Sequence, residues 1–222
     1  MRVCAVIPAF NEAARVGDVV REARGRLPGV VVVDDGSADG TADAARRAGA
    51  EVLRHPANRG KGAALKTGMG RAFDDGYDAV VVLDADGQHA PGEIPLFLEA
   101  AERTGADIVV GNRMENATGM PLVRYLTNRF TSAVVSKLAG QRIPDSQCGF
   151  RLINERAFRR MGFATSRFDT ESEMLIEAGR AGCRIVSVLV RTIYGAEKSK
   201  INPFVDTARF FRLVARHLRR PR

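Results

Sequence analysis

The first 110 residues alternate between short apolar runs and longer segments whose apolar side chains recur at helical spacing. Short apolar runs bounded by turn residues are typical of the buried strands of a parallel sheet. Their alternation with amphipathic helices predicts an α/β fold, with a mostly parallel sheet and helices on both faces. The expected strands are residues 3–7, 30–34, 51–54, 79–83 and 107–110, and the expected helices are residues 12–24, 40–48, 60–74 and 93–103.

Polar residues and one proline mark where three of these helices begin. Asn11 can cap the first helix and Ser37 or Asp39 the second, because their side-chain oxygens can accept hydrogen bonds from free backbone amides. Pro91 can be an early residue of the fourth helix, where the amide that it lacks would have no partner anyway.

The pattern is less regular after residue 110. A loop at residues 111–120 leads to a long helical pattern at residues 122–138, and an irregular stretch follows at residues 143–152. A helix is expected at residues 170–181 and a strand at residues 184–191. We expect this half to elaborate the same core, so that residues 1–202 form one domain and residues 203–222 a C-terminal helix.

Length and composition fit a single domain with a substantial core. The chain has 222 residues, of which 45% are hydrophobic. No apolar run is long enough to cross a bilayer, and the first ten residues lack the features of a signal peptide, so we expect a cytoplasmic protein. Cys4, Cys148 and Cys183 are widely spaced, and we expect reduced thiols in the core.

Charge is divided unevenly between the two halves of the chain. Residues 1–110 carry a net charge of −4, whereas residues 111–222 carry +12. A basic half favours an anionic partner such as a nucleic acid, an anionic lipid or a phosphorylated substrate. We expect no nucleic acid partner, because the sequence shows no zinc ligands, no aromatic-rich strand motif and no tryptophan.

Two acidic turns follow apolar runs, Asp-Asp-Gly-Ser at residues 34–37 and Asp-Ala-Asp-Gly-Gln at residues 84–88. Ligands of open α/β sheets bind beyond the carboxyl ends of the strands, so both turns should face one crevice. Asp84 and Asp86 can point the same way and share one divalent cation, with its other positions left to phosphate oxygens. An Asp-Gly turn can also be an ordinary surface turn, and we expect His89 to be a solvated turn residue rather than a ligand.

Two other loops are expected near this crevice. Residues 8–12 (Pro-Ala-Phe-Asn-Glu) follow the first strand, where Phe10 can form an apolar wall and Glu12, or Asp35 from the next strand, can accept hydrogen bonds from a base or ribose. Residues 58–66 resemble a phosphate loop, since glycines precede a helix and Lys61 lies beside its start. The spacing differs from that of the nucleoside-triphosphate loop, so we expect Lys61 to have a supporting role near the bound nucleotide.

Taken in order, these motifs resemble those of family 2 glycosyltransferases with the GT-A fold, an α/β, Rossmann-like arrangement. The matching segments are residues 8–12, 34–37, 58–62, 84–88 and 111–113. Residues 145–151 and 199–200 resemble the branch that makes polyprenyl-phosphate sugars, such as dolichyl-phosphate mannose synthases and dolichyl-phosphate glucosyltransferases. The resemblance covers residues 3 to about 202, which would be the catalytic domain.

The resemblance implies roles for individual residues. Asp84, Asp86 and Gln88 would hold Mg²⁺ or Mn²⁺, and Arg113, Arg129 and Lys200 would hold the acceptor phosphate. Of these, Asp86, Arg113 and Arg129 would take the most direct part in catalysis, although Arg129 could equally be a solvated residue on a helix. The remaining substrate-binding residues would be Pro8, Phe10, Glu12, Asp35, Lys61, Ala85 and Asp145.

The implied reaction is transfer of a hexose from a nucleoside-diphosphate sugar, GDP-mannose or UDP-glucose, to a polyprenyl phosphate with inversion. Residues 194–200 lack the arginine that mannose synthases carry ahead of their Gly-x-Ser-Lys segment, so the donor stays open. The alternative is a family 2 enzyme of cell-surface polysaccharide synthesis that acts on a sugar hydroxyl, with Asp145, Asp169 or Glu171 as general base. A nucleotidyltransferase or a non-catalytic binding module fits the motifs less well.

The C-terminal segment predicts a basic amphipathic helix. Asn202 can cap it and Pro203 can open it. One face carries apolar side chains, and the arginines lie largely off that face. The helix could rest on an anionic membrane, giving a peripheral enzyme on the cytoplasmic face, or pack on the core. The expected apolar face consists of Phe204, Ala208, Phe211, Ala215 and Leu218.

Overall fold

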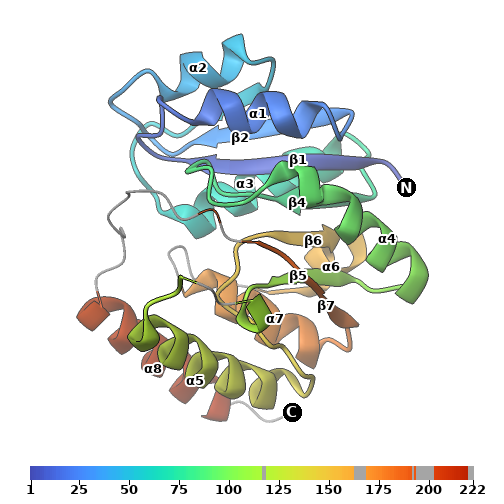
Figure 1. Ribbon diagram of the computed structural model, residues 1–222, viewed down its shortest axis with the longest axis vertical. Coiled ribbons are helices and arrows are strands. Elements are labelled where there is room, and N and C mark those ends of the chain that lie inside the picture. Colours follow the sequence, from blue (N-terminus) through green and yellow to red (C-terminus); the bar gives the residue numbers. More distant parts are fainter. Residues whose placement is uncertain (117–118, 163–168, 192, 194–202, 220–222) are drawn as a thin grey trace.

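A single mixed sheet organises the computed structural model, which describes all residues except 117–118, 163–168, 192, 194–202 and 220–222 (Figure 1). In the described part of the chain its seven strands have the order β3-β2-β1-β4-β6-β5-β7. The strands are β1 (Val3–Ala9), β2 (Gly29–Asp34), β3 (Glu51–Arg54), β4 (Ala79–Val82), β5 (Ile108–Asn112), β6 (Arg151–Asn154) and β7 (Ile185–Leu189).

Helices follow most of the strands. They are α1 (Val16–Arg24), α2 (Thr41–Arg47), α3 (Lys61–Asp74), α4 (Ile94–Thr104), α5 (Leu122–Ala139), α6 (Glu155–Arg160), α7 (Thr170–Arg180) and α8 (Pro203–Arg219), with short 3₁₀ turns η1 (Pro91–Glu93) and η2 (Met114–Asn116). The expected α/β fold with a mostly parallel sheet flanked by helices is confirmed.

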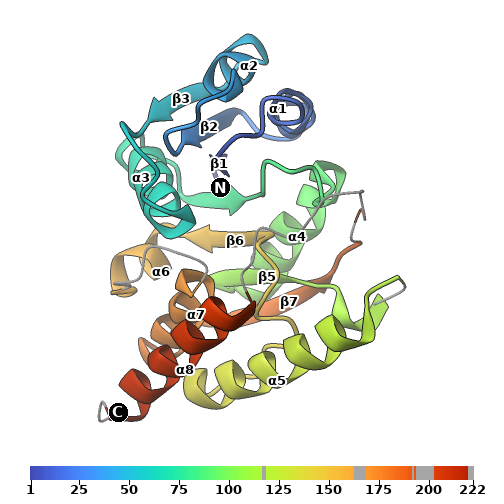
Figure 2. The same ribbon diagram turned by 90° about the vertical axis from the view of Figure 1, so that its left-hand side faces the viewer.

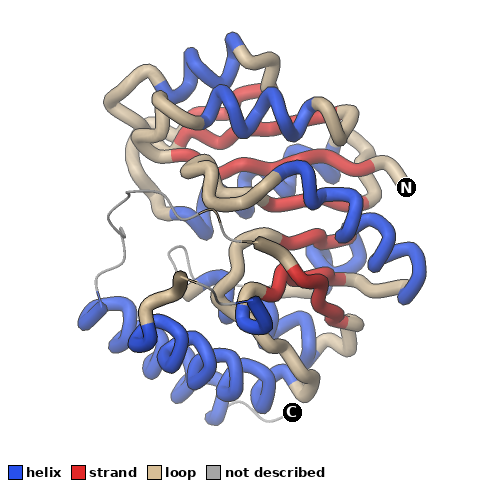
Figure 3. The backbone as a smooth tube through the Cα atoms, viewed as in Figure 1, coloured by secondary structure: helices blue, strands red, loops and turns tan. Residues whose placement is uncertain are grey.

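The core lies between the sheet and two helical layers. Helices α3, α6 and α7 cover one face of the sheet, and α1 and α4 cover the other (Figures 2 and 3). The central strands are rich in valine and buried along their length, as expected for strands covered on both faces. Helix α5 packs outside α7, where a Cβ added to Gly179 would lie 2.3 Å from the carbonyl oxygen of Ala139.

Strand β6 was not expected from the sequence, which predicted an irregular stretch there. It runs antiparallel between β4 and β5, with Arg151 opposite both Val82 and Val110. Because β6 runs in the opposite direction, its N-terminal end lies at the carboxyl edge of β4 and β5. The segment before β6 therefore joins the loops that follow the parallel strands.

The start of the first helix was also predicted wrongly. Helix α1 begins at Val16 rather than at Glu12, and Asn11, with φ of +53°, turns the chain instead of capping it. Neither Ser37 nor Asp39 is the cap residue of α2, which is Gly40, although Asp39 Oδ1 accepts a hydrogen bond from the Thr41 amide (3.0 Å). Pro91 opens the 3₁₀ turn η1 just before α4.

Helix α8 is attached to α7 by polar and apolar contacts. His217 is fully buried, and its Nε2 lies 2.8 Å from Glu177 Oε1. The Arg180 guanidinium donates to the His217 carbonyl oxygen (2.7 Å), while Phe210 and Leu213 join the core. The face predicted to be apolar is exposed at Ala208, Phe211, Ala215 and Leu218; the side chain of Phe204 and the capping residue Asn202 lie outside the description.

All three cysteines are buried free thiols, as expected. Burial raises the pKa of Cys4 and of Cys148 to about 12 and also raises that of Cys183. Within the described ranges, no helix is long and apolar enough to cross a membrane.

Candidate active site

Asp35, at the end of β2, shapes the loop that leads into α3. Its carboxylate accepts hydrogen bonds from the amides of Arg59 (3.0 Å) and Gly60 (2.8 Å), and from His55 Nδ1 (2.6 Å). Gly60 has φ of +96°, a conformation that glycine adopts without strain. Asp35 therefore positions the N-terminus of α3 and its first residue, Lys61, while its contact with a nucleotide stays a prediction.

The loop after β1 is tied to the loop after β2. The Asn11 amide donates to Ser37 Oγ (2.9 Å), and the Glu12 amide donates to Thr41 Oγ1 (2.8 Å). Pro8 is buried in β1, whereas Phe10 is exposed where the strand ends. The expected convergence of the two loops at one edge is thus present in the structure.

The acidic turn after β4 is folded on itself. Asp86 Oδ1 accepts a hydrogen bond from the Gln88 amide (2.9 Å), and Ala85 is buried beneath the turn. His89 is not the solvated residue that we expected, because its ring is buried and stacks on Phe150 with centroids 5.3 Å apart. Its Nδ1 accepts a hydrogen bond from the Asp84 amide (3.2 Å). Burial lowers the pKa of His89 although the Asp84 carboxylate opposes this.

Asp84 lies beside a lysine and a second carboxylate. Lys61 Nζ is 2.5 Å from Asp84 Oδ1 and 2.8 Å from Glu171 Oε1, at the start of α7. Burial works against the charged form of each group. Nevertheless the lysine, with His89 and Arg113, lowers the pKa of Asp84 to about 2, and the two carboxylates raise the pKa of Lys61. Asp84 and Lys61 are therefore both charged at neutral pH.

The segment before β6 brings α7 to this cluster. A Cβ added to Gly149 would lie 2.9 Å from Asp84 Oδ2 and 3.2 Å from Lys61 Nζ, so the backbone approaches the charges closely. Arg151 is almost fully buried and donates to three carbonyl oxygens, those of Ser146, Cys148 and Glu171, each at 2.8 Å. It joins the segment to the start of α7, a role that the sequence did not indicate.

Arg113, directly after β5, is paired with Asp145 in the interior. Its Nε lies 2.7 Å from Asp145 Oδ2 and its Nη2 3.0 Å from Asp145 Oδ1, and its amide donates to the same carboxylate (3.2 Å). The arginine side chain is 7% exposed and the aspartate is fully buried. The pair fixes the loop after β5 against the segment before β6.

Arg129, a second residue expected to hold the acceptor phosphate, does not join this cluster. Arg129 is exposed on α5, and its Nη1 donates to the Tyr125 hydroxyl (3.3 Å) one turn away on the same helix. Lys200 lies outside the described residues.

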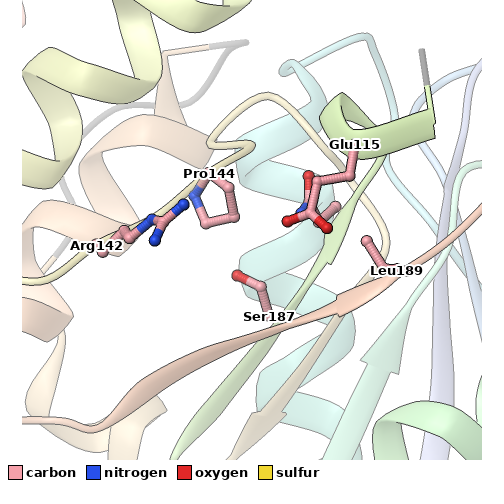
Figure 4. Close-up of a pocket in the computed structure, with 6 residues that line it drawn as sticks. Glu115, Arg142, Pro144, Ser187 and Leu189 are labelled. Carbon is pink, nitrogen blue, oxygen red and sulfur yellow. The ribbon is translucent and has the colours of Figure 1, made fainter.

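An open cavity lies at the carboxyl ends of β5 and β7. Its volume is about 380 Å³. Figure 4 shows Glu115, Arg142 and Ser187 around it. Asn112, Pro144 and Leu189 complete the lining. The cavity does not include Asp84 or Lys61, but two of its lining residues, Asn112 and Pro144, are the sequence neighbours of Arg113 and Asp145.

A family model described as glycosyl transferase family 2 matches residues 4–164 of the chain. The chain belongs to this family. The matched span includes β1 to β6, the acidic turn after β4 and the Arg113–Asp145 pair.

Relatives of this family 2 glycosyltransferase include enzymes named for lipid phosphates. One is the UDP-N-acetylglucosamine–dolichyl-phosphate N-acetylglucosaminyltransferase of Methanococcus voltae, 31% identical over 212 residues, covering 85% of this chain and 84% of the relative. Another is the undecaprenyl-phosphate mannosyltransferase of Micrococcus luteus, 32% identical over 203 residues and covering 85% and 82%.

A solved structure with the same fold is glucosyl-3-phosphoglycerate synthase from Mycobacterium tuberculosis, in complex with Mn²⁺, UDP and glucosyl-3-phosphoglycerate. Its TM-score is 0.68 at 21% identity, and the match covers 98% of this chain and 78% of that chain. The likeness places the family 2 chain in the GT-A fold.

The turn after β4 of this glycosyltransferase carries oxygen side chains of the kind that bind a divalent cation. Asp84, Asp86 and Gln88 offer the oxygen ligands that Mg²⁺ and Mn²⁺ prefer, and the Lys61 ammonium already holds positive charge against Asp84. No group of three His, Cys, Asp or Glu side chains among the described residues could hold a metal by itself. A cation at this turn would need oxygen ligands besides the two aspartates, from Gln88, water or a bound molecule.

Proposed function

We infer that this glycosyltransferase moves a hexose from a nucleoside-diphosphate sugar to a polyprenyl phosphate, with inversion at the anomeric carbon. The relatives named for dolichyl and undecaprenyl phosphate support the acceptor. GDP-mannose and UDP-glucose are both candidate donors. The carboxyl edge of the sheet would bind the nucleotide through Pro8, Phe10, Glu12 and Asp35.

Mg²⁺ or Mn²⁺, held by Asp84, Asp86 and Gln88, would neutralise charge on the leaving diphosphate. The chain's own residues do the rest of the positioning. The N-terminus of α3 presents backbone amides and Lys61, a favourable place for phosphate. The Arg113–Asp145 ion pair holds the loop after β5 in place.

The ion pairing of a candidate general base supports a phosphate acceptor. Asp145, one of the carboxylates considered as general base, is already held by Arg113 in a buried ion pair. A hydroxyl acceptor needs such a base. A phosphate monoester has a second pKa near 6 and is already an anionic nucleophile at neutral pH. This arrangement favours the lipid phosphate over the sugar hydroxyl.

Helix α5 supports a membrane-bound acceptor. Its exposed side chains include Leu122, Val123, Leu126 and Phe130, which are 54–77% exposed and recur at helical spacing, with Arg124 and Arg129 beside them. Phe211 and Leu218 of α8 are exposed as well. An apolar stripe flanked by arginines suits the surface of a bilayer that contains anionic lipid. We propose that α5, with α8, rests on that surface while the site takes the lipid phosphate.

Transfer assays test the reaction. Labelled UDP-glucose and GDP-mannose would each be offered with a prenyl phosphate, 3-phosphoglycerate or a sugar, with and without Mn²⁺. We expect labelled lipid with one donor and only with the cation. Transfer to the sugar or to 3-phosphoglycerate, with none to the prenyl phosphate, would contradict the proposal.

Vesicle sedimentation tests the membrane surface. The variants Leu126→Glu and Phe130→Glu should lose salt-sensitive binding to vesicles that contain phosphatidylglycerol. Leu96→Glu provides a matched control, because Leu96 is also exposed but lies on α4. Equal binding by all three variants would remove α5 from the membrane contact.

A further inference from the structure

A lysine ammonium lies at the centre of the acidic cluster, where the proposed cation would bind. Lys61 contacts Asp84 from one side and Glu171 from the other, and all three side chains are at least three-quarters buried. We propose that Lys61 is an internal counter-ion, which bridges these carboxylates in the free protein and moves to the donor diphosphate when a divalent cation takes Asp84. This inference rests on the proposed function, which supplies the cation and the diphosphate.

Competition for Asp84 is the first step of the argument. Divalent cations bind carboxylate oxygens at about 2.0–2.6 Å, and Lys61 Nζ already lies 2.5 Å from Asp84 Oδ1. Two positive charges cannot occupy neighbouring positions on one carboxylate without strong repulsion in a partly buried site. A cation that binds Asp84 therefore competes with the ammonium for that carboxylate.

The position of Lys61 provides a destination for the displaced ammonium. It is the first residue of α3, so its side chain starts at the helix N-terminus where phosphate groups bind favourably. A lysine side chain is long and flexible, and its ammonium is a point charge that can change partners. Gly149 has no side chain to crowd the ammonium, whereas a Cβ at this position would lie only 3.2 Å from Lys61 Nζ.

This exchange would couple the two ligands. Without the diphosphate, a Lys61 that has left Asp84 keeps only Glu171 as an anionic partner and lies close to the cation, so the bare cation should bind less tightly. With the diphosphate present, the cation and the ammonium both gain phosphate oxygens. Lys61 would therefore suppress binding of the free metal and favour joint binding of cation and donor.

Mn²⁺ titrations of the full chain, followed by electron paramagnetic resonance without nucleotide, test the exchange. Lys61→Met should bind Mn²⁺ at least about tenfold more tightly than the wild type, the scale expected when a unit charge is removed a few ångströms from a bound cation. Lys66→Met is the matched control, since it removes the same charge at an exposed position on α3. It should change the affinity less than about twofold.

A second variant guards against unfolding of the first. Lys61→Met/Glu171→Gln removes the ammonium together with one of the two carboxylates that it bridges. Asp84 then has neither the lysine nor the glutamate charge beside it. It should also bind Mn²⁺ more tightly than the wild type, and circular dichroism would check its fold. Wild-type or weaker Mn²⁺ affinity in both folded variants would overturn the counter-ion role.

The same titrations with UDP or GDP separate this inference from the proposed function. Mn²⁺ binding by the wild type with nucleotide, lost in Asp84→Asn, would support the cation site even if the Lys61 variants showed no gain. Absence of Mn²⁺ binding by the wild type with either nucleotide would overturn both proposals.

Discussion

Removing the carboxylate of Asp145 should destabilise the protein strongly, because it leaves the Arg113 guanidinium buried without its partner. Arg113 makes three hydrogen bonds to that carboxylate, two from its side chain and one from its backbone amide. Breaking a buried ion pair from one side costs about 3–5 kcal/mol. For a chain of this length that corresponds to a fall in Tm of roughly 6–20 °C.

Urea denaturation followed by circular dichroism would measure the free energy of unfolding of Asp145→Ala. Asp43→Ala is the control, because Asp43 forms an exposed pair with Arg46 on α2, and its removal should cost less than about 1 kcal/mol. The double variant Arg113→Met/Asp145→Leu removes both charges and should recover much of the loss. A cost below about 1 kcal/mol for Asp145→Ala would refute the view that the pair fixes the two loops.

Three other changes test separate parts of the structure. Asp86→Ala should abolish transfer. It should shift the free energy of unfolding by less than about 1 kcal/mol, because the side chain lies in a turn. Activity of the metal-stripped wild-type enzyme would contradict the role of Asp86 as a metal ligand. The raised pKa values keep the three buried thiols protonated at pH 8. A thiol reagent should therefore label none of the three cysteines rapidly in the native protein, and all three in urea. Rapid labelling of the native protein would contradict their burial. Gly179→Ala should push α5 away from α7 and lower the free energy of unfolding by about 1–3 kcal/mol, which a thermal melt would detect as a lower Tm. An unchanged Tm would rule out the close contact.

The first half of the fold could be predicted from local patterns, whereas the second half depended on long-range contacts. Residues 79–83 form a run of apolar side chains, and a strand follows from that pattern alone. Strand β6 has only four residues and begins with Arg151, which is charged yet buried. Its three carbonyl partners include Glu171, twenty residues further along the chain. No local pattern reveals such a partner.

The location of the candidate site could be predicted from the sequence, but the contacts between its side chains could not. The positions of Asp84 and Asp86 after β4 follow from the strand pattern and the rule for carboxyl edges. The contact between Lys61 and Asp84 does not, because it depends on how α3 sits against the sheet. The prediction for His89 was wrong for a similar reason, because its ring stacks on Phe150, which is far away in the sequence.

The late position of β6 in the chain has a consequence during protein synthesis. When Asn112 has been made, β4 and β5 each still lack the neighbour that will join them in the sheet. The roughly forty residues up to Asn154 take about 2–8 s to synthesise at typical rates. For that time the valine-rich edge of β4 is open to other chains on the ribosome or to a chaperone. A nascent chain that stops near residue 112 should therefore aggregate, although it already carries most of the loops that we propose bind the nucleotide.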